Sequence, residues 1–354
     1  MKTHIFAASR NLADFQRYAQ RCAEVGFSGL NLIEAARTAF LGCAAAALSG
    51  ADLDLATGIA VAFPRSPMIT AQVAWELADA SRGRFRLGLG SQVKAQVERR
   101  YSAPYSPPGP RLREYVLALR AIYDAFQNDA PLRFSGDYYE FSWLGAMFSP
   151  GPLEVGPPPV DIAALNPWML RAAGEVADGL HVHPLQNPVY LRETMLPELH
   201  RGAVAGARDL RGFTLFVPFF TAVGDTQDEV ARRREICRDR LAFYGSVPTY
   251  QSIFDQLEWP QAPEGIREAR KQGAPLARAM PDELLDCFIV ESTWSGLAKE
   301  IASRCAPLTG FDVKPILYLA GMDLDETSRE FEQFGQVAIE LTALELSGCT
   351  REMR

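Results

Sequence analysis

Residues 80–92 read Ala80-Ser81-Arg82-Gly83-Arg84-Phe85-Arg86-Leu87-Gly88-Leu89-Gly90-Ser91-Gln92. The polar residues 81–83 end one helix, residues 85–89 form a short buried strand, and residues 90–92 open the next helix. Glycines at the end of a strand let the backbone approach a ligand closely. A helix start offers free N–H groups and a partial positive charge to an anion. The stretch therefore predicts a strand-to-helix turn that either binds an anionic ligand or is only a tight connection.

Two further stretches have the same strand–turn–helix form. Residues 57–67 lead from a strand, through Gly58 and a proline-rich turn, into a helix. Residues 159–169 lead from another strand into a helix. In that second stretch Asn166 is a suitable N-cap and Pro167 suits the first helical position.

Strands and helices alternate along the whole chain. The predicted strands lie at 3–8, 30–34, 53–61, 85–89, 160–165, 180–184, 213–222 and 313–319. A last helix is expected from Asp325. Eight strands with no reversal of the pattern favour a (β/α)8 TIM barrel, an α/β fold, over a doubly wound sheet. Barrels of this size are usually one domain, so residues 1–354 are predicted to form a single domain.

Two segments interrupt the alternation. The first, 131–158, is rich in aromatic residues and proline and precedes the fifth strand. We expect its aromatic part, 134–148, to form a hairpin that caps the barrel and covers a substrate pocket, and the alternative is that these aromatic residues serve only in packing. The second, 245–281, follows the seventh strand and its helix, and long excursions of this kind are often functional lids. A lid and a disordered loop remain equally open for this second insertion.

Composition argues against several classes of protein. The chain has 354 residues, 48% hydrophobic and 22% charged, which is enough for a large core. A net charge of −7 argues against nucleic acid as a partner. No apolar run reaches about 18 residues, so no membrane partner is expected, and the N-terminus lacks a secretory leader. The six cysteines form no CxxC pair, which favours free thiols in a reducing cytoplasm.

Three blocks together carry a resemblance to a known family. They are residues 81–92, residues 62–67 (Ala62-Phe63-Pro64-Arg65-Ser66-Pro67) and residues 173–179 (Ala173-Gly174-Glu175-Val176-Ala177-Asp178-Gly179). From about Leu12 to Leu319 the chain resembles the luciferase-like monooxygenase superfamily. It is most similar to the branch that depends on coenzyme F420, an 8-hydroxy-5-deazaflavin. The resemblance implies a (β/α)8 barrel, a small-molecule substrate, a ring bound at the C-terminal mouth and a homodimer.

The resemblance also implies which residues bind the cofactor. Relatives support the ring on a non-prolyl cis peptide bond at the end of the third strand, where this chain has Gly58-Ile59. Other cofactor contacts follow from matching segments, namely Gly90, Ser91, Gln92, Gln96, Ala163, Ala164, Leu165 and Asn166. His181 and His183 flank Val182 and therefore point to one face of the sixth strand. We assign His181 to the cofactor and His183 to the chemistry at the barrel mouth.

The acidic position after the second strand departs from the pattern of relatives. They commonly carry an acidic residue followed by His or Asp, whereas Glu34 is followed here by Ala35-Ala36-Arg37. Glu34 is therefore either a proton donor or a structural carboxylate. No metal site is predicted, because the two neighbouring histidines lack a further cluster of ligands.

The function predicted from these residues is oxidoreduction with a flavin or deazaflavin. We expect hydride transfer between an F420-type cofactor and a small organic substrate, with Glu34 and His183 as catalytic residues. A reduced-FMN monooxygenase of the same fold is the first alternative. Lys94, the only cation in the fourth βα unit near a phosphate, barely discriminates between the two. Because the usual His is missing, a non-catalytic flavin-binding barrel is the second alternative.

Overall fold

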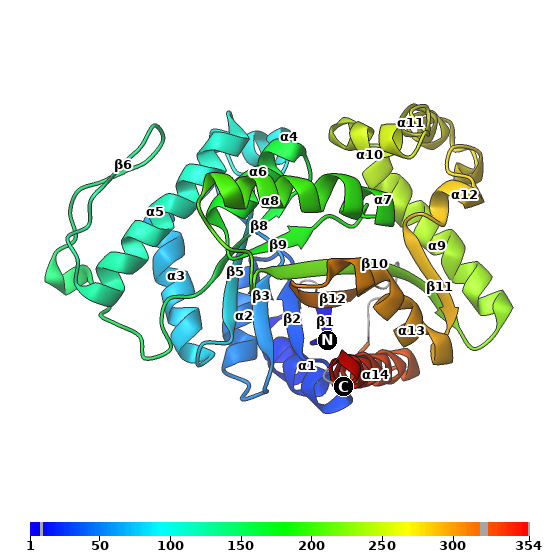
Figure 1. Ribbon diagram of the computed structural model, residues 1–354, viewed down its shortest axis with the longest axis horizontal. Helices are drawn as coiled ribbons and strands as arrows, with labels where there is room; N and C mark the ends of the chain where they lie inside the picture. The colour runs from blue at the N-terminus through cyan, green and yellow to red at the C-terminus, as the bar shows by residue number, and fades with distance from the viewer. Residues whose placement is uncertain (8–9, 319–324, 353–354) are drawn as a thin grey trace.

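The computed structural model describes residues 1–7, 10–318 and 325–352, without the side chains of 346–352. Its centre is a closed barrel of eight parallel strands (Figure 1), which confirms the predicted fold class. In barrel order these are β1 (His4–Ala7), β2 (Gly29–Leu32), β3 (Asp54–Thr57), β5 (Phe85–Gly90), β8 (Val160–Ala164), β9 (Gly179–Val182), β10 (Thr214–Gly224) and β12 (Asp312–Tyr318). The barrel closes where β12 pairs with β1.

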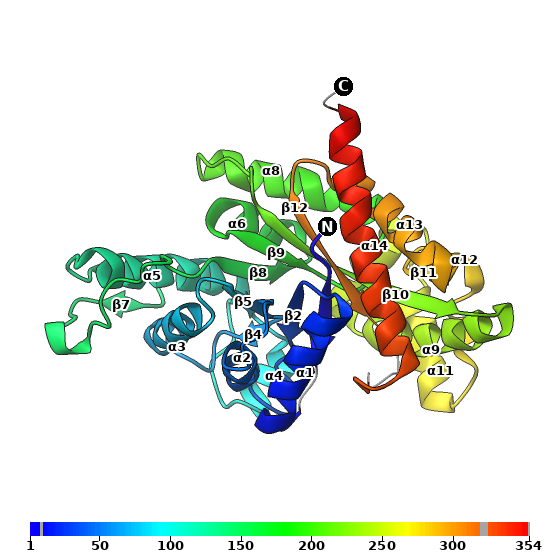
Figure 2. The same ribbon diagram turned by 90° about the horizontal axis from the view of Figure 1, so that it is seen from below.

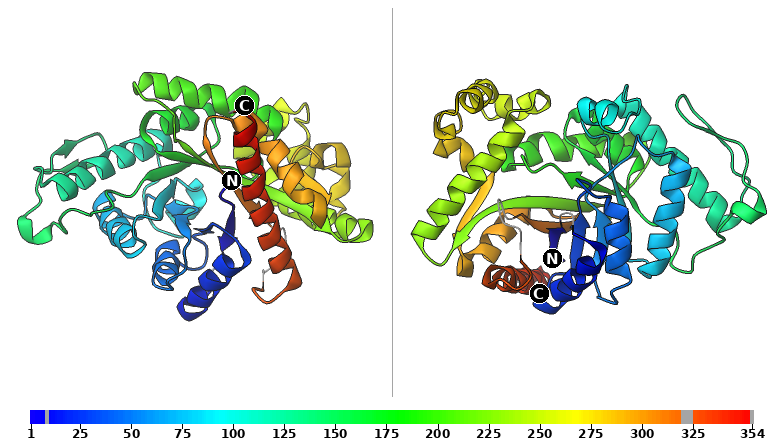
Figure 3. Two further views of the ribbon diagram at one scale, coloured as in Figure 1. Left: turned by 60° about the horizontal axis from the view of Figure 1, so that its bottom comes forward. Right: turned by 180° about the vertical axis from the view of Figure 1, so that it is seen from behind.

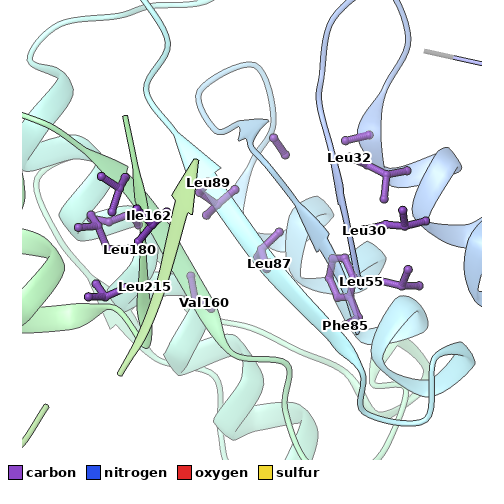
Figure 4. Packing of buried hydrophobic residues seen from close by; sticks show 14 of the residues in the cluster. Leu30, Leu32, Leu55, Phe85, Leu87, Leu89, Val160, Ile162, Leu180 and Leu215 are labelled. Atoms are coloured by element: carbon purple, nitrogen blue, oxygen red, sulfur yellow. The ribbon is translucent and has the colours of Figure 1, made fainter. Parts of the chain in front are cut away.

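Alternation along each strand separates two kinds of side chain. The outward set is apolar and packs under the helices (Figure 4), as shown by Leu30, Leu32, Leu55, Phe85, Leu87, Leu89, Val160, Ile162, Leu180 and Leu215. The inward set contains several polar groups, namely His4, Asn31, Arg86, Asp161, His181 and Lys314. The barrel therefore has an apolar outer face and a partly polar interior.

The polar interior is held by specific pairs. The guanidinium of Arg86 donates to both carboxylate oxygens of Asp161, over 2.9 and 2.5 Å. The Nδ1 of His4 lies 2.7 Å from Asn31 Oδ1, and Lys314 Nζ lies 3.4 Å from Asp54 Oδ2. Buried charges need such partners, because burial without them is strongly unfavourable.

Helices cover the barrel from outside (Figure 2). Those that follow the barrel strands are α1 (Leu12–Val25), α2 (Ala39–Ala47), α3 (Pro67–Ala80), α5 (Pro108–Asn128), α6 (Pro167–Val176), α8 (Leu196–Ala205), α9 (Gln227–Gly245) and α14 (Arg329–Glu352). Short segments α4 (Lys94–Arg99) and α7 (Pro188–Tyr190) precede α5 and α8. No helix in the described ranges has both the length and the apolar character needed to cross a membrane.

Several element boundaries differ from those predicted. The third strand is interrupted, and β4 (Ala60–Val61) pairs with β5 after the break. The helix expected at residue 90 begins only at Lys94, and the last helix begins at Arg329 rather than Asp325. The predicted ends of the first and eighth strands, at residues 8 and 319, lie outside the described residues.

The first insertion forms a hairpin but does not cap the barrel, so that prediction was wrong. Its strands β6 (Phe134–Ser135) and β7 (Glu140–Phe141) pair in antiparallel fashion and project beyond α5 (Figure 1). The Glu114 carboxylate on α5 accepts the backbone N–H groups of residues 137–139. Trp143 and Phe148 are 69% and 55% exposed, and neither residue lines the cavity at the C-terminal ends of the barrel strands. The hairpin lies beside the barrel and not over its mouth, because the Glu114 carboxylate that binds it belongs to a helix of the outer layer.

The second insertion is folded and contributes a small lobe beside the barrel mouth. It contains α10 (Gln251–Gln256) and α11 (Ala262–Gln272), which pack with α9, the far end of β10 and α12 (Asp282–Leu285), the short helix that directly follows the insertion (Figure 3). A strand that the sequence analysis missed, β11 (Ile289–Thr293), pairs in parallel with that end of β10 and is followed by α13 (Trp294–Cys305). The lobe has its own hydrophobic cluster, which includes Phe254 and Ile266.

Candidate functional site

A cavity of about 770 Å³ opens at the C-terminal ends of the barrel strands. This is the end at which parallel barrels place their sites. The predicted site residues that line it are Gly58, Ile59, Gly90, Ser91, Gln92, Ala163, Ala164, Leu165, Asn166, His181 and His183. Glu34 and Gln96 do not line it. Residues distant in sequence are thus brought together by the ends of β3, β5, β8 and β9.

The break between β3 and β4 forms one wall of the cavity. The Gly58-Ile59 peptide bond is cis, as the resemblance implied. The Gly58 N–H donates to Leu32 O over 2.8 Å, so the turn is tied to the neighbouring strand. A Cβ added at Gly58 would lie 3.0 Å from the Asn31 Cβ, which leaves little room for a larger residue.

The end of β5 and the start of α6 face the same cavity. A Cβ at Gly90 would lie 2.7 Å from Ile59 Cδ1, so the glycine keeps the space between these walls open. Asn166 caps α6 by accepting the Met169 N–H over 2.9 Å, with Pro167 at the first helical position. Lys94 also lines the cavity. Lys94 and the dipole at the start of α6 both favour an anionic group at this rim.

His181 lies at the inner end of the cavity and is neutral. Its ring stacks on Phe216 with centroids 4.4 Å apart. Burial, together with the positive charge of Arg86, lowers the pKa of His181 to about 3. Its Nε2 is buried and has no hydrogen-bond partner among the described residues. Such an unpaired polar atom is unfavourable unless a ligand satisfies it.

His183 lies nearer the mouth, just beyond β9. Its Nδ1 accepts the Leu185 N–H over 3.1 Å. Its ring contacts Tyr250 and Tyr244, with centroids 4.3 and 5.3 Å away. Burial among these rings lowers the pKa of His183 to about 3. His183 is therefore a neutral side chain with one nitrogen already engaged by the backbone.

Glu34 is occupied by structural partners instead of facing the cavity. Its carboxylate accepts the Val61 N–H over 2.7 Å and forms an ion pair with Arg65. Its side chain is only 3% exposed. These contacts hold the segment after the cis peptide bond against the end of β2. They favour the second of the two roles expected for Glu34, that of a structural carboxylate. Gln96 also lies away from the cavity, because it is on the exposed part of α4.

The outer cavity is lined by aromatic residues that were not predicted from the sequence. These come from separate elements and are Tyr105, Trp168, Tyr244, Tyr250 and Tyr318. Tyr244 lies in the last turn of α9, and Tyr250 lies in the second insertion, which therefore reaches the site as a lid would. Trp168 could have been predicted from the sequence, because it directly follows Pro167 at the start of the helix after the fifth predicted strand. Tyr250 had no local signal.

Charges and metal ligands are scarce at the site. Lys94 is the only charged side chain among the described residues of the cavity wall. Within the described part of the chain, no three His, Cys, Asp or Glu side chains are grouped as a metal site requires.

Comparisons with known proteins agree with this architecture. The profile of the luciferase-like monooxygenase family matches residues 1–308. An uncharacterized protein of Mycobacterium tuberculosis is 37% identical over 282 residues, which are 79% of this chain and 83% of that protein. The structure of the coenzyme F420-dependent tetrahydromethanopterin reductase from Methanopyrus kandleri superposes with a TM-score of 0.75 at 19% identity, covering 96% and 98% of the two chains.

A second solved structure shares the fold at 16% identity. It is the oxygenating constituent of 3,6-diketocamphane monooxygenase from Pseudomonas putida in complex with FMN, with a TM-score of 0.65 and coverage of 95% and 96%. The fold is thus shared with proteins that use either cofactor. The profile match over most of the chain decides the classification: the chain belongs to the luciferase-like monooxygenase family.

Proposed function

We propose that this protein is an F420-dependent oxidoreductase that transfers a hydride between the deazaflavin and a small organic substrate. The observation that carries the proposal is that the predicted cofactor residues other than Gln96 converge on one cavity. Membership of an oxidoreductase and monooxygenase family supports an enzyme of this class. The F420-dependent reductase of the same fold supports the choice of cofactor.

The residues of the cavity fit a planar ring with an anionic tail. Gly90 leaves a gap that a Cβ would fill against Ile59, and the buried His181 Nε2 has no hydrogen-bond partner in the part of the chain that the structure describes. We assign Gly58, Ile59 and His181 to the ring. We assign Ser91, Gln92, Lys94 and the first turn of α6 to the tail, because free N–H groups and a positive charge favour phosphate there.

The division of labour follows from these assignments. When bound, the cofactor supplies the hydride chemistry, and the protein supplies orientation and electrostatics. His183 faces the substrate region and is the proposed catalytic residue. Glu34 is proposed to act through Arg65 and Val61 as a positioning residue, which revises the proton-donor role expected from sequence.

A reduced-FMN monooxygenase is the second candidate. The positive charge at the rim consists of one lysine and the start of a helix. These groups suit the short phosphate of FMN as well as the tail of F420, so they favour the FMN-dependent candidate only weakly. The FMN-containing structure of the same fold supports this alternative.

Titration of the purified full chain with F420 and with FMN tests the proposal. Fluorescence of each cofactor reports binding, and absorbance of the reduced form reports turnover with carbonyl and alcohol substrates. We expect F420 to bind at least about tenfold more tightly than FMN, a difference of about 1.4 kcal/mol. Tighter binding of FMN with oxygen consumption would establish the second candidate. Tight binding of either cofactor without turnover on any substrate would favour a non-catalytic binding barrel.

A further inference from the structure

The hydrogen bond at His183 determines which nitrogen of that ring carries the proton. Nδ1 accepts the Leu185 N–H, so in the neutral ring the proton must reside on Nε2. No described residue forms a hydrogen bond with Nε2. His183 is partly exposed and lines the cavity. The backbone contact therefore leaves Nε2–H as the ring group that His183 can offer to a ligand of the cavity, and it leaves the neutral ring with no free acceptor nitrogen.

The surroundings of His183 keep the ring neutral. It is packed against Tyr250 from the second insertion and Tyr244 from α9, and neither carries a charge at neutral pH. Burial lowers the pKa of His183, and the pKa values of both tyrosines are raised. A neutral imidazole in such a site polarises an oxygen without first taking up a proton.

The charge of the cavity restricts the substrate. Lys94 lies at the rim assigned to the cofactor tail, and the described cavity wall holds no arginine or second lysine. The sequences at 8–9 and 319–324 also contain no Lys or Arg. An anionic substrate would lose its hydration without gaining a cation in return, which is unfavourable.

Resting on the proposed function, we infer that the substrate is uncharged and presents a carbonyl or hydroxyl oxygen to His183 Nε2–H. In reduction, the carbonyl carbon accepts a hydride with its electron pair from the reduced cofactor, and the C=O π electrons move to oxygen. His183 Nε2–H stabilises the charge on that oxygen, which then takes a proton from water. Oxidation of the alcohol reverses each transfer, and His183 stays neutral throughout.

The first test reads the imidazole directly and needs no turnover. The chain has four histidines, so ¹⁵N-histidine labelling gives a spectrum that single His→Gln variants can assign. We expect His183 to be the neutral Nε2–H form from pH 5 to 8, with no titration. Addition of cyclohexanone to the cofactor-loaded protein should shift its Nε2 resonance, and cyclohexanecarboxylate should not. A proton on Nδ1, a midpoint near 6.5, no ketone-dependent shift or a shift with the carboxylate would each overturn the inference.

The second test uses matched variants at position 183. His183→Ala removes the donor and should lower kcat/KM for a ketone substrate about 10²–10³-fold. His183→Gln places an amide N–H near the former Nε2 and should recover at least about tenfold of that loss, whereas His183→Asn should not. Equal losses in all three variants would contradict the donor role.

Cofactor titration of the same samples separates the two proposals. If no flavin or deazaflavin binds, the proposed function fails while the spectrum still reports the His183 tautomer. If the cofactor binds but carboxylate substrates are preferred over matched ketones, only the present inference fails.

Discussion

At the scale of single residues, Glu34 shows how partners decide a role. Glu34→Ala removes the acceptor of the Val61 N–H and the carboxylate partner of Arg65, whose guanidinium keeps the Val61 carbonyl oxygen as an acceptor. We expect a loss of about 3 kcal/mol in the free energy of unfolding, in the range for a broken buried ion pair. Glu34→Gln keeps an acceptor oxygen and should lose less. Urea denaturation measures both losses. A Glu34→Gln variant with unchanged stability and no turnover would restore the proton-donor role.

Buried histidines make the stability of the fold depend on pH. Burial lowers the pKa of His4 to about 4, whereas an ordinary histidine titrates near 6.5. Below pH 6.5, His4 of the unfolded chain binds a proton, whereas His4 of the folded protein stays neutral until about pH 4. Acid therefore favours unfolding. We expect His4 to contribute a loss of about 1.4 kcal/mol per pH unit as the pH falls from about 6 to 4.

Denaturation of the wild type and of His4→Gln at pH 7, 6 and 5 checks this expectation. The variant should show the shallower decline in the free energy of unfolding. Parallel pH dependence in the two proteins would mean that His4 is protonated in the fold or is solvated there.

At the scale of elements, the end of β5 is shaped by Gly90. A valine there would meet Ile59 at less than 3 Å and fill space between two cavity walls. We expect Gly90→Val to weaken cofactor binding about tenfold or more, roughly 1.4 kcal/mol, with the circular dichroism spectrum unchanged. Ala95→Val on the exposed part of α4 is the matched control. Equal cofactor affinities of the wild type and Gly90→Val in a fluorescence titration would contradict the assignment of Gly90 to the cofactor site.

The strands β5 and β8 are joined inside the barrel by the Arg86–Asp161 pair. Asp161 is fully buried, and burial raises its pKa although Arg86 opposes the shift. Asp161→Ala should lower the free energy of unfolding by about 3–5 kcal/mol, because Arg86 then loses its carboxylate. Asp209→Ala, which breaks an exposed pair with Arg211, should leave stability unchanged. Thermal melts of both variants distinguish buried from surface pairing.

At the scale of the whole molecule, the two insertions have different relations to the site. The hairpin projects from α5, whereas Tyr250 of the second insertion lines the cavity. The double change Trp143→Ser, Phe148→Ser should leave cofactor affinity and turnover unchanged. Tyr250→Ala should raise KM about tenfold or more, since burial of an aromatic ring is worth about 1.5–3 kcal/mol. Steady-state kinetics of the two variants tests this contrast, and a defect from the hairpin change would reverse it.

The homodimer and the cytoplasmic location remain predictions from the resemblance and the thiols. Sedimentation velocity of the full chain measures the first.

The sequence by itself determined the features that depend on neighbours along the chain. Strand and helix alternation, the Asn166 cap and the strand-to-helix turn at residues 90–92 follow from short-range chemistry, whereas the place of residues 58–59 at a strand end came from the family resemblance. Because parallel barrel strands share one C-terminal end, these residues had to meet once the fold class was known.

Only the tertiary structure decided which distant groups share a surface. Arg65 forms an ion pair with Glu34, which is 31 positions away in the sequence. Glu114 of α5 accepts hydrogen bonds from the backbone of the hairpin, and the ring of Tyr250 from the second insertion contacts His183. No local pattern encodes these contacts, because each depends on how separate elements pack around the barrel. The same packing placed Leu185 N–H on His183 Nδ1, and with that contact it determined what the histidine can do.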